Sequence, residues 1–291
     1  MAENLSIRSD EMSVKVSTDG AQLMSVEKNG TEYLWQGDPA YWADRAPVLF
    51  PAVGAVRNGR TIFEGKYYDL TKHGLVRHAE FAVREHTAGS VTLGVTDSEE
   101  SLLKYPYHFD FSVKYEVKEN VLSCEMTAVN TGSRKMPYIL GGHPAFNVPF
   151  AGGKFEDYAV RFEKPETMSL PSINADMLID HSQPLMKIEN LSEIKLSHDL
   201  FLNDALIFDG TDSKKISLVS PDGKSIEMDY SDFAIIAVWS SRNGGPFAAL
   251  EPWVGCATCT DEDDDFLSKR YVQILEPGEK KSYAFTVRIN G

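Results

Sequence analysis

Residues 109–117 read Phe-Asp-Phe-Ser-Val-Lys-Tyr-Glu-Val, so apolar and polar side chains alternate along the whole stretch. Successive side chains of a β-strand point to opposite faces, and this stretch therefore predicts a strand with one buried and one exposed face. The same alternation occurs at residues 14–16 and 90–95, and a last strand is expected at 281–289. Half-buried strands dominate the predicted secondary structure.

Tight-turn signals separate these stretches. They occur at Asn29-Gly30, Glu64-Gly65-Lys66, Asn130-Thr131-Gly132, Asp222-Gly223 and Pro277-Gly278. Helical periodicity is weak, and the best short helices are expected near residues 97–103 and 261–267. No Pro/Gly/Ser-rich linker and no internal repeat divides the chain. The sequence therefore predicts an all-β sandwich or barrel with few short helices, and residues 1–291 are expected to form a single domain.

Composition and charge limit the classes of partner. The chain is 42% hydrophobic and 25% charged, which is typical of a folded globular protein. Its formal net charge of -14 opposes binding to polyanions, because affinity for nucleic acids depends on Lys and Arg neutralising phosphates. We therefore expect no nucleic-acid partner and no anionic membrane partner.

The cysteines and the first residues bear on location. Three cysteines, Cys124, Cys256 and Cys259, do not resemble a disulfide framework and favour a reducing compartment. The first ten residues lack the apolar core of a signal peptide, and no run approaches the ~20 apolar residues that span a bilayer. A cytoplasmic protein is expected.

Three short motifs place titratable side chains beside turn-forming or aromatic neighbours. They are Gly141-Gly142-His143-Pro144-Ala145-Phe146, His73-Gly74, and Leu250-Glu251-Pro252-Trp253. Glu251 follows the apolar run 247–250, so its carboxylate is expected at the edge of a buried strand. Partial desolvation there would raise the pKa of Glu251 toward the range that suits a general base. The alternative is that the histidines are purely structural and that the glutamate lies in an exposed loop.

Other residue types complete or exclude particular sites. Arg57, Arg60 and Arg77 lie near His73 in the sequence and offer donors for sugar hydroxyls, carboxylates or phosphates. Phe146 and Trp253 offer flat apolar surfaces to a pyranose ring. Cys256-Ala257-Thr258-Cys259 is half of a zinc-ribbon motif, but no second pair completes it, so no metal is expected. Neither a phosphate-binding Gly-rich loop nor a Gly-x-Ser-x-Gly motif occurs.

These motifs follow one another in an order that resembles the aldose 1-epimerase (mutarotase) superfamily, in particular its bacterial LacX-like branch. The resemblance covers nearly the whole length. Its segments are Gly20-Ala21-Gln22-Leu23, Glu32-Tyr33-Leu34-Trp35, Ala46–Pro51, Glu64–Arg77, Gly142–Phe146 and Leu250–Trp253. It implies a large antiparallel β-sandwich of the galactose mutarotase-like supersandwich type, with a sugar cleft and no cofactor.

The resemblance also implies roles for individual residues. Glu251 would be the base that takes the proton of the anomeric hydroxyl, and His143 the acid that protonates the ring oxygen. His73 would hydrogen-bond the sugar near the ring oxygen. Asp204 would bind sugar hydroxyls, with Asp209 as its competitor for that place. The partner is a small sugar, and the protein is expected to be a monomer or a homodimer.

One position departs from the family pattern. The family's sugar-binding arginine aligns with Ala55, so Arg57 would have to take its place. The other substrate-binding residues that the resemblance implies are Arg77, Asp204, Phe146 and Trp253. An aldose 1-epimerase acting on galactose or glucose is the first hypothesis. The alternatives are a hexose-6-phosphate 1-epimerase, a non-catalytic or regulatory carbohydrate-binding protein, and a glycoside hydrolase using Glu251 with Asp204.

Overall fold

The largest element of the structure, a computed structural model that describes residues 2–291, is a nine-stranded antiparallel sheet. Its order is β16-β15-β18-β19-β23-β11-β10-β9-β8. In that order the strands are Ile179–Lys195, Ala159–Ile173, Lys215–Val219, Ser225–Asp229, Lys280–Asn290, Val121–Asn130, Phe109–Lys118, Ser90–Thr96 and Ala82–His86. The three strands expected at 90–95, 109–117 and 281–289 are β9, β10 and β23 of this sheet.

A six-stranded sheet holds most of the buried polar residues discussed below. Its order is β17-β20-β21-β13-β5, and β14 pairs with β21 beside that path. These strands are Leu206–Asp209, Ile235–Trp239, Phe247–Trp253, Gly141–Gly142, Val48–Leu49 and, for β14, Ala145–Asn147. Every residue of β21 is buried, so this strand is covered on both faces.

The remaining strands form three smaller sheets. The four-stranded sheet has β1 Asn4–Arg8, β2 Met12–Ser17, β3 Leu23–Lys28 and β4 Thr31–Glu32, in sequence order. The two-stranded sheets pair β6 Arg60–Phe63 with β7 Lys66–Asp69, and β12 Met136–Tyr138 with β22 Gln273–Leu275. The predicted turn at Asn29-Gly30 joins β3 to β4. Both turn residues have positive φ, 52° and 77°, as a two-residue hairpin turn of type I′ requires.

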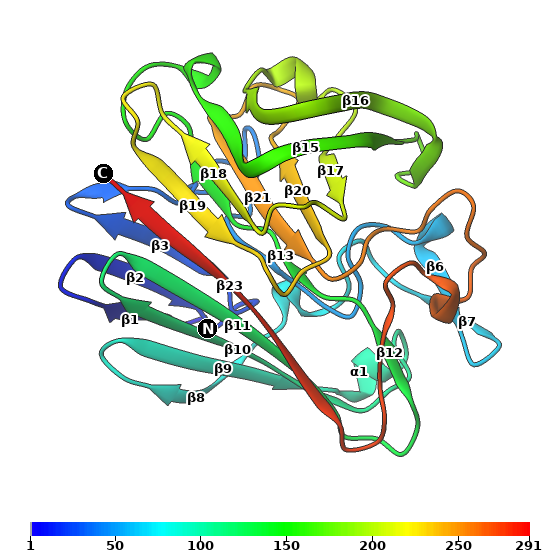
Figure 1. Cartoon of the computed structure of the whole chain (residues 1–291). Helices are drawn as coiled ribbons and strands as arrows, with labels where there is room; N and C mark the ends of the chain where they lie inside the picture. Colours follow the sequence, from blue (N-terminus) through cyan, green and yellow to red (C-terminus); the bar gives the residue numbers. More distant parts are fainter. Residues whose placement is uncertain (1) are drawn as a thin grey trace.

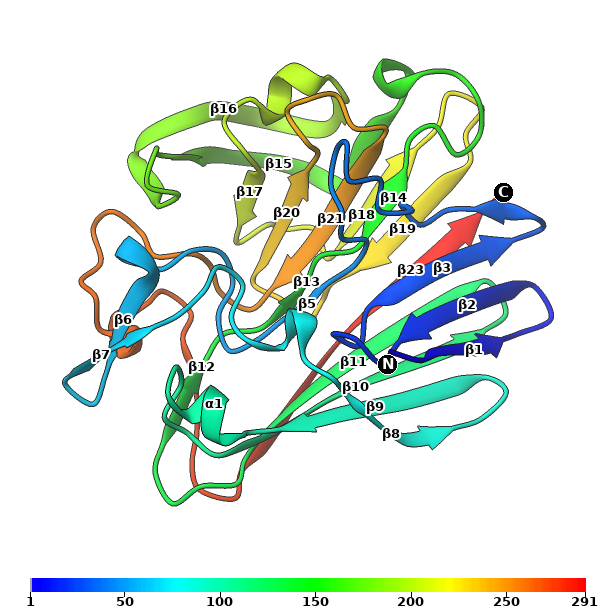
Figure 2. The same ribbon diagram turned by 180° about the vertical axis from the view of Figure 1, so that it is seen from behind.

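The sheets make two layers, visible from both sides in Figures 1 and 2. The nine-stranded sheet is one layer, and the four- and six-stranded sheets together are the other. The apolar residues of β10 are buried between the layers, as the alternation of residues 109–117 predicts. Phe111 of β10 stacks on Phe50 at the end of β5, with ring centroids 4.6 Å apart. The prediction of a large antiparallel β-sandwich is confirmed.

Helices are few and short. The one α-helix among the described residues, α1 Glu99–Leu102, lies within the predicted stretch 97–103, and Ser98 caps its N-terminus. The 3₁₀ helices are η1 Arg57–Gly59, η2 Val76–His78, η3 Phe155–Asp157, η4 His198–Phe201 and η5 Phe266–Ser268. Within residues 2–291 no helix is long and apolar enough to cross a membrane.

The second predicted helix, at residues 261–267, is wrong except for its end in η5. The acidic segment is an irregular loop because its carbonyl groups accept hydrogen bonds from β6 and from Arg57, and not from amides of the same segment. Asp264 accepts hydrogen bonds from the Ile62 amide and the Thr61 hydroxyl, and Glu262 accepts one from Arg57. Each of these bonds uses a carbonyl that a helix would need.

Candidate active site

A cavity of about 250 Å³ is lined by the six-stranded sheet and by the tip of the β15–β16 hairpin. Strand β21 contributes Glu251 and Trp253, and the connection after β13 contributes His143. The segment before η2 adds His73 from a part of the chain far away in sequence. The structure therefore brings the predicted catalytic residues together in one cavity.

Strand geometry explains the position of Glu251. Residues two apart on a strand face the same side, so Glu251 and Trp253 both reach the cavity while Leu250 joins the core. The residue paired with Glu251 on β20 is Ala237, whose small side chain leaves room beside the carboxyl. The Glu251 residue is only 1% exposed, which makes the carboxyl a buried polar group rather than a loop glutamate.

Aromatic rings fix the imidazole of His143. The Trp42 ring stacks on it with centroids 4.7 Å apart, and the Trp239 ring meets it edge-on at 5.4 Å. The His143 amide donates to the carbonyl of Pro47, which anchors the backbone after the two glycines. Packed between these rings, the imidazole has little freedom to change its rotamer.

The imidazole and the carboxyl are in direct contact. His143 Nε2 lies 3.1 Å from Glu251 Oε2, and both side chains are buried. Burial lowers the pKa of His143 from 6.5 to about 3, and the positive charges of Lys72 and Arg77 act in the same direction. Burial also raises the pKa of Glu251 well above its usual value, and the charge of Asp204 adds to this effect. Burial therefore favours the neutral form of both groups.

His73 is held in one tautomer by a single residue. The Gly54 amide donates to His73 Nδ1 at 3.2 Å, while the His73 amide donates to the Gly54 carbonyl at 2.9 Å. Because Nδ1 accepts, the hydrogen of the neutral ring is on Nε2. Burial and the neighbouring His143 lower the pKa of His73, so this neutral form predominates. His73 can thus donate one hydrogen bond to a ligand.

Glycine is required directly after this histidine. His73 and Gly74 both have positive φ, 68° and 79°. A Cβ on Gly74 would lie 2.3 Å from the carbonyl oxygen of Phe50, far inside any real contact distance. The predicted sharp turn after His73 therefore also lets the loop approach the end of β5.

Charged residues line the wall of the cavity. Arg77 forms an ion pair with Asp44, and Lys72 also lines the cavity. Asp204 follows η4 with a positive φ of 74° and accepts a hydrogen bond from the Ala205 amide. Its competitor Asp209 lies outside the cavity, where its carboxylate accepts a hydrogen bond from the Tyr271 hydroxyl. The structure thus places Asp204, and not Asp209, at the site.

Several buried polar atoms of the cavity have no hydrogen-bond partner within residues 2–291. They are His143 Nδ1, Trp253 Nε1, Arg77 Nε and Glu251 Oε2, the last of which contacts His143 without hydrogen-bond geometry. Leaving such atoms unpaired costs free energy, so native proteins rarely bury them without a reason.

Two predicted substrate-binding residues lie elsewhere, and these assignments are corrected. Arg57 binds the 259–264 loop, pairing with Asp264 at 3.1 Å and donating to the Glu262 carbonyl at 2.7 Å. Its guanidinium is therefore occupied and does not replace the missing arginine. Phe146 is 1% exposed and belongs to the main hydrophobic core, because β14 pairs with β21 and turns this ring inward.

Three charged or aromatic residues that line the cavity, Lys72, Trp42 and Trp239, were not among the predicted site residues. Lys72 and Ala55 both line the cavity, and the position of Lys72 next to His73 in the sequence could have indicated this. Trp239 lines the cavity and also contacts His143. Trp42 lies in the loop between β4 and β5, whose position depends on the tertiary fold.

The cysteine pair shows no metal centre. Cys256 and Cys259 are buried free thiols, and among the described residues no three His, Cys, Asp or Glu side chains are grouped to hold a metal ion. The neighbouring polar groups bind one another, since Lys269 donates to Thr258 and lies 3.7 Å from Glu262. This cluster is separate from the His143–Glu251 pair.

Comparison with known proteins finds relatives that match nearly the whole chain. A model of the family described as aldose 1-epimerase matches residues 3–288. The plasmid-encoded protein LacX of Lactococcus lactis subsp. lactis is 36% identical over 295 residues, which cover 97% of this chain and 99% of that protein.

Solved structures agree along the whole chain. A galactose mutarotase related enzyme from Lactobacillus acidophilus has a TM-score of 0.93 and 31% identity, covering 99% of this chain and 98% of its own. A galactose mutarotase-like protein from Lactobacillus casei ATCC 334 has a TM-score of 0.88 and 28% identity, with 99% and 100% covered.

Proposed function

The chain belongs to the aldose 1-epimerase family, and from this premise we propose that it interconverts the α and β anomers of a free hexose such as galactose or glucose. The contact between His143 and Glu251 carries the proposal. Mutarotation needs a base at the anomeric hydroxyl and an acid at the ring oxygen, and these two atoms belong to one hemiacetal. A carboxyl and an imidazole 3.1 Å apart can each reach one of them.

The proton count of the pair suits this chemistry. A neutral carboxyl with a neutral imidazole holds one proton, and so does a carboxylate with an imidazolium. With that proton on His143, Glu251 is the base and His143 the acid. Glu251 then takes the proton of the anomeric hydroxyl, while His143 gives its proton to the ring oxygen and the C1–ring oxygen bond breaks. Rotation about C1–C2 and the reverse transfers close the ring on its other face.

The other lining residues would position the sugar. The hydrogen on His73 Nε2 is available near the pair, and Asp204 can accept from hydroxyl groups. The indole of Trp253 offers an apolar face to the sugar ring. A volume of about 250 Å³ lies just below the ~300–1,000 Å³ of pockets for drug-sized ligands, which suits one sugar ring.

Polarimetry on freshly dissolved α-glucose and α-galactose tests the proposal. We expect Glu251→Gln and His143→Ala each to lower kcat by about 10²- to 10⁴-fold. The matched controls are Glu85→Gln and His181→Ala, which change exposed residues of β8 and β16 and should retain full activity. Wild-type rates in both active-site variants would show the acid–base assignment to be wrong.

A non-catalytic carbohydrate-binding protein is the second candidate, because Ala55 lines the cavity where the family pattern has arginine. Lys72 lies beside Ala55 and supplies a cation to the same wall, which favours the enzyme. Calorimetry that shows sugar binding, together with polarimetry that shows no acceleration, would establish the second candidate instead.

A hexose 6-phosphate is less well supported as the substrate. Arg77 is the only arginine among the described residues that line the catalytic cavity, and Asp44 neutralises it, while Arg57 binds the 259–264 loop. Comparing the rates for a hexose and for its 6-phosphate separates the two substrates.

A further inference from the structure

The ring of Trp42 lies over the imidazole of His143. The ring centroids are 4.7 Å apart and the planes meet at 28°, so the two rings are stacked. His73 and Trp239 also contact this imidazole, but their planes cross it at 79° and 83°. Among residues 2–291, Trp42 is therefore the only aromatic residue that stacks on His143.

Backbone contacts hold Trp42 in this position. Its amide donates to the Asp38 carbonyl, and its own carbonyl accepts from the indole of Trp35, both at 2.9 Å. Further along the same loop, the Gln22 side chain accepts from the Arg45 amide at 2.6 Å. The loop is thus anchored to its surroundings on both sides of Trp42, and the ring is in place before a ligand binds.

The proposed reaction needs His143 in its protonated form, because the proton for the ring oxygen comes from this imidazole. Burial opposes that form, and the positive charges of Lys72 and Arg77 oppose it as well. The neighbouring His73 is neutral and brings no favourable charge. The carboxylate of Glu251, 3.1 Å from His143 Nε2, favours the imidazolium. A second favourable contact would therefore make His143 a better acid.

The face of an indole supplies such a contact. Among aromatic side chains, tryptophan attracts a cation most strongly when the cation lies within about 6 Å of the ring centre, and the attraction grows where water is excluded. The distance of 4.7 Å between Trp42 and His143 is within this range, and His143 is only 8% exposed. Asp44, two residues further along the loop, is already paired with Arg77. The stacked indole is therefore what this loop offers to the charged acid.

We propose that Trp42 is a positioning residue that stabilises the imidazolium form of His143 through its π face and thereby makes this histidine a stronger participant in proton transfer to the ring oxygen. The inference rests on the proposed function for the reaction itself. It distinguishes Trp42 from a platform that stacks on the sugar, because a contact with the acid affects kcat, whereas a contact with the sugar in its ground state affects KM.

Polarimetry of Trp42→Phe and Trp42→Leu tests the proposal. Phenylalanine keeps a π face that attracts a cation less strongly, and leucine keeps an apolar side chain without one. We expect kcat to fall about tenfold in Trp42→Leu and about threefold in Trp42→Phe, with KM changed less than about twofold in both. Tyr67→Leu, which removes an exposed aromatic ring from β7, is the matched control and should keep full activity. Equal losses of kcat in the two Trp42 variants, or a rise in KM in place of the fall in kcat, would overturn the proposal.

A double-mutant cycle with His143→Gln shows whether Trp42 acts through the acid. In that background the imidazolium is absent, so adding Trp42→Leu should lower the residual rate by less than about twofold. A further tenfold loss would overturn the proposal, because Trp42 would then act on the sugar or on the loop.

NMR separates this inference from the proposed function. If the wild type turns over no sugar, the proposed function fails, and the ¹³Cε1 shift of His143 between pH 7 and pH 4 then tests Trp42 alone. The imidazolium fraction should be about tenfold smaller in Trp42→Leu than in the wild type, which corresponds to about one pKa unit. Equal fractions in the two proteins would overturn the proposal.

Discussion

Glu251 is a carboxyl whose nearest basic group within residues 2–291 is the uncharged imidazole of His143. Ionising it inside the cavity is unfavourable, because burial removes the water that would solvate the charge. The unfolded chain has no such penalty. The residue that the reaction needs is therefore one that weakens the fold at neutral pH, a common conflict at active sites.

The sign of this effect can be tested with Glu251→Gln. Because the pKa of Glu251 is raised from 4.5 on folding, the folded state binds more protons above pH 4.5, and the contribution of Glu251 to stability falls as the pH rises. Gln has no charge to bury, so the variant should gain about 1–2 kcal/mol of unfolding free energy at pH 8 and almost none at pH 4. Urea unfolding at the two pH values measures it. A difference independent of pH would contradict the raised pKa.

His143 acts in the opposite direction. Its pKa falls from 6.5 to about 3 on folding, so its contribution to stability is present above pH 6.5 and is lost as the pH falls toward 3. The rise due to His143 ends at pH 6.5 and the fall due to Glu251 begins at pH 4.5, so the two effects cancel between these values and their combined contribution to stability is greatest there. The glutamine variant should retain the loss of stability at acid pH that is due to His143.

Single residues also show what the sequence could reveal about the site. His73, His143 and Glu251 were found because glycine, proline and aromatic neighbours frame each of them. The wrong assignment of Arg57 has a physical cause: its distance in sequence from His73 is short, but the acidic 259–264 loop captures its guanidinium. Only tertiary structure decides between such competing partners.

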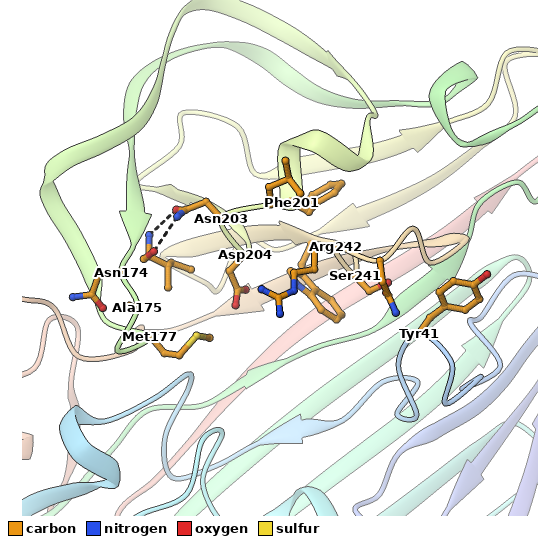
Figure 3. A pocket seen from close by; sticks show the side chains of 13 residues that line it. Tyr41, Asn174, Ala175, Met177, Phe201, Asn203, Asp204, Ser241 and Arg242 are labelled. Carbon is orange, nitrogen blue, oxygen red and sulfur yellow. Dashed lines mark hydrogen bonds between the residues drawn. The ribbon is translucent and has the colours of Figure 1, made fainter.

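At the scale of elements, the β15–β16 hairpin forms one lip of the cavity. Its tip is tied to the segment before Asp204 by Asn203, which accepts from the Ile173 amide at 2.9 Å and donates to the Ile173 carbonyl at 3.0 Å. These two bonds are drawn in Figure 3. They keep the hairpin tip, which carries Ile173 and Met177, at the wall of the cavity.

Asn203→Ala should loosen this lip. Losing two side-chain bonds of about 0.5–1.5 kcal/mol each should raise KM about tenfold or more with a smaller change in kcat, because the acid–base pair is untouched. Asn203→Asp keeps the acceptor and loses the donor, so it should fall between. Polarimetry gives both constants, and hydrogen exchange at residues 170–180 reports the loosening. Unchanged KM with unchanged exchange would show that the hairpin needs no such tie.

The strands of the sandwich differ in how well the sequence predicts them. The alternation of residues 109–117 identified β10 because its two faces have different surroundings. The β15–β16 hairpin was not predicted: it contains Pro165, Pro171 and Pro184, and its pairing shifts register several times. Proline removes ladder hydrogen bonds, so such strands occur at sheet edges, where β16 lies.

At the scale of the whole molecule, the contact of Gly74 with Phe50 connects the catalytic loop to both layers. Phe50 stacks on Phe111 of the nine-stranded sheet, and its carbonyl accepts from the Leu75 amide at 2.7 Å. The position of His73 thus depends on the packing between the layers, and not on its own loop alone.

Gly74→Ala should therefore affect both stability and activity. Its Cβ would meet the Phe50 carbonyl oxygen at 2.3 Å, and we expect a loss of at least about 2 kcal/mol in unfolding free energy. Gly65→Ala is the matched control, since Gly65 has a similar φ of 74° with nothing within 4 Å of an added Cβ. That control should lose only the about 1–2 kcal/mol due to backbone conformation. Thermal unfolding and polarimetry of both variants measure the difference, and equal losses would contradict the close approach.

The positions of the four tryptophans have a practical consequence. Trp42, Trp239 and Trp253 line the cavity, and the fourth tryptophan, Trp35, donates its indole hydrogen to the Trp42 carbonyl. Every indole chromophore of the chain is therefore at the ligand site or one contact away. Intrinsic fluorescence of the unlabelled protein should report sugar occupancy directly, free of emission from distant tryptophans.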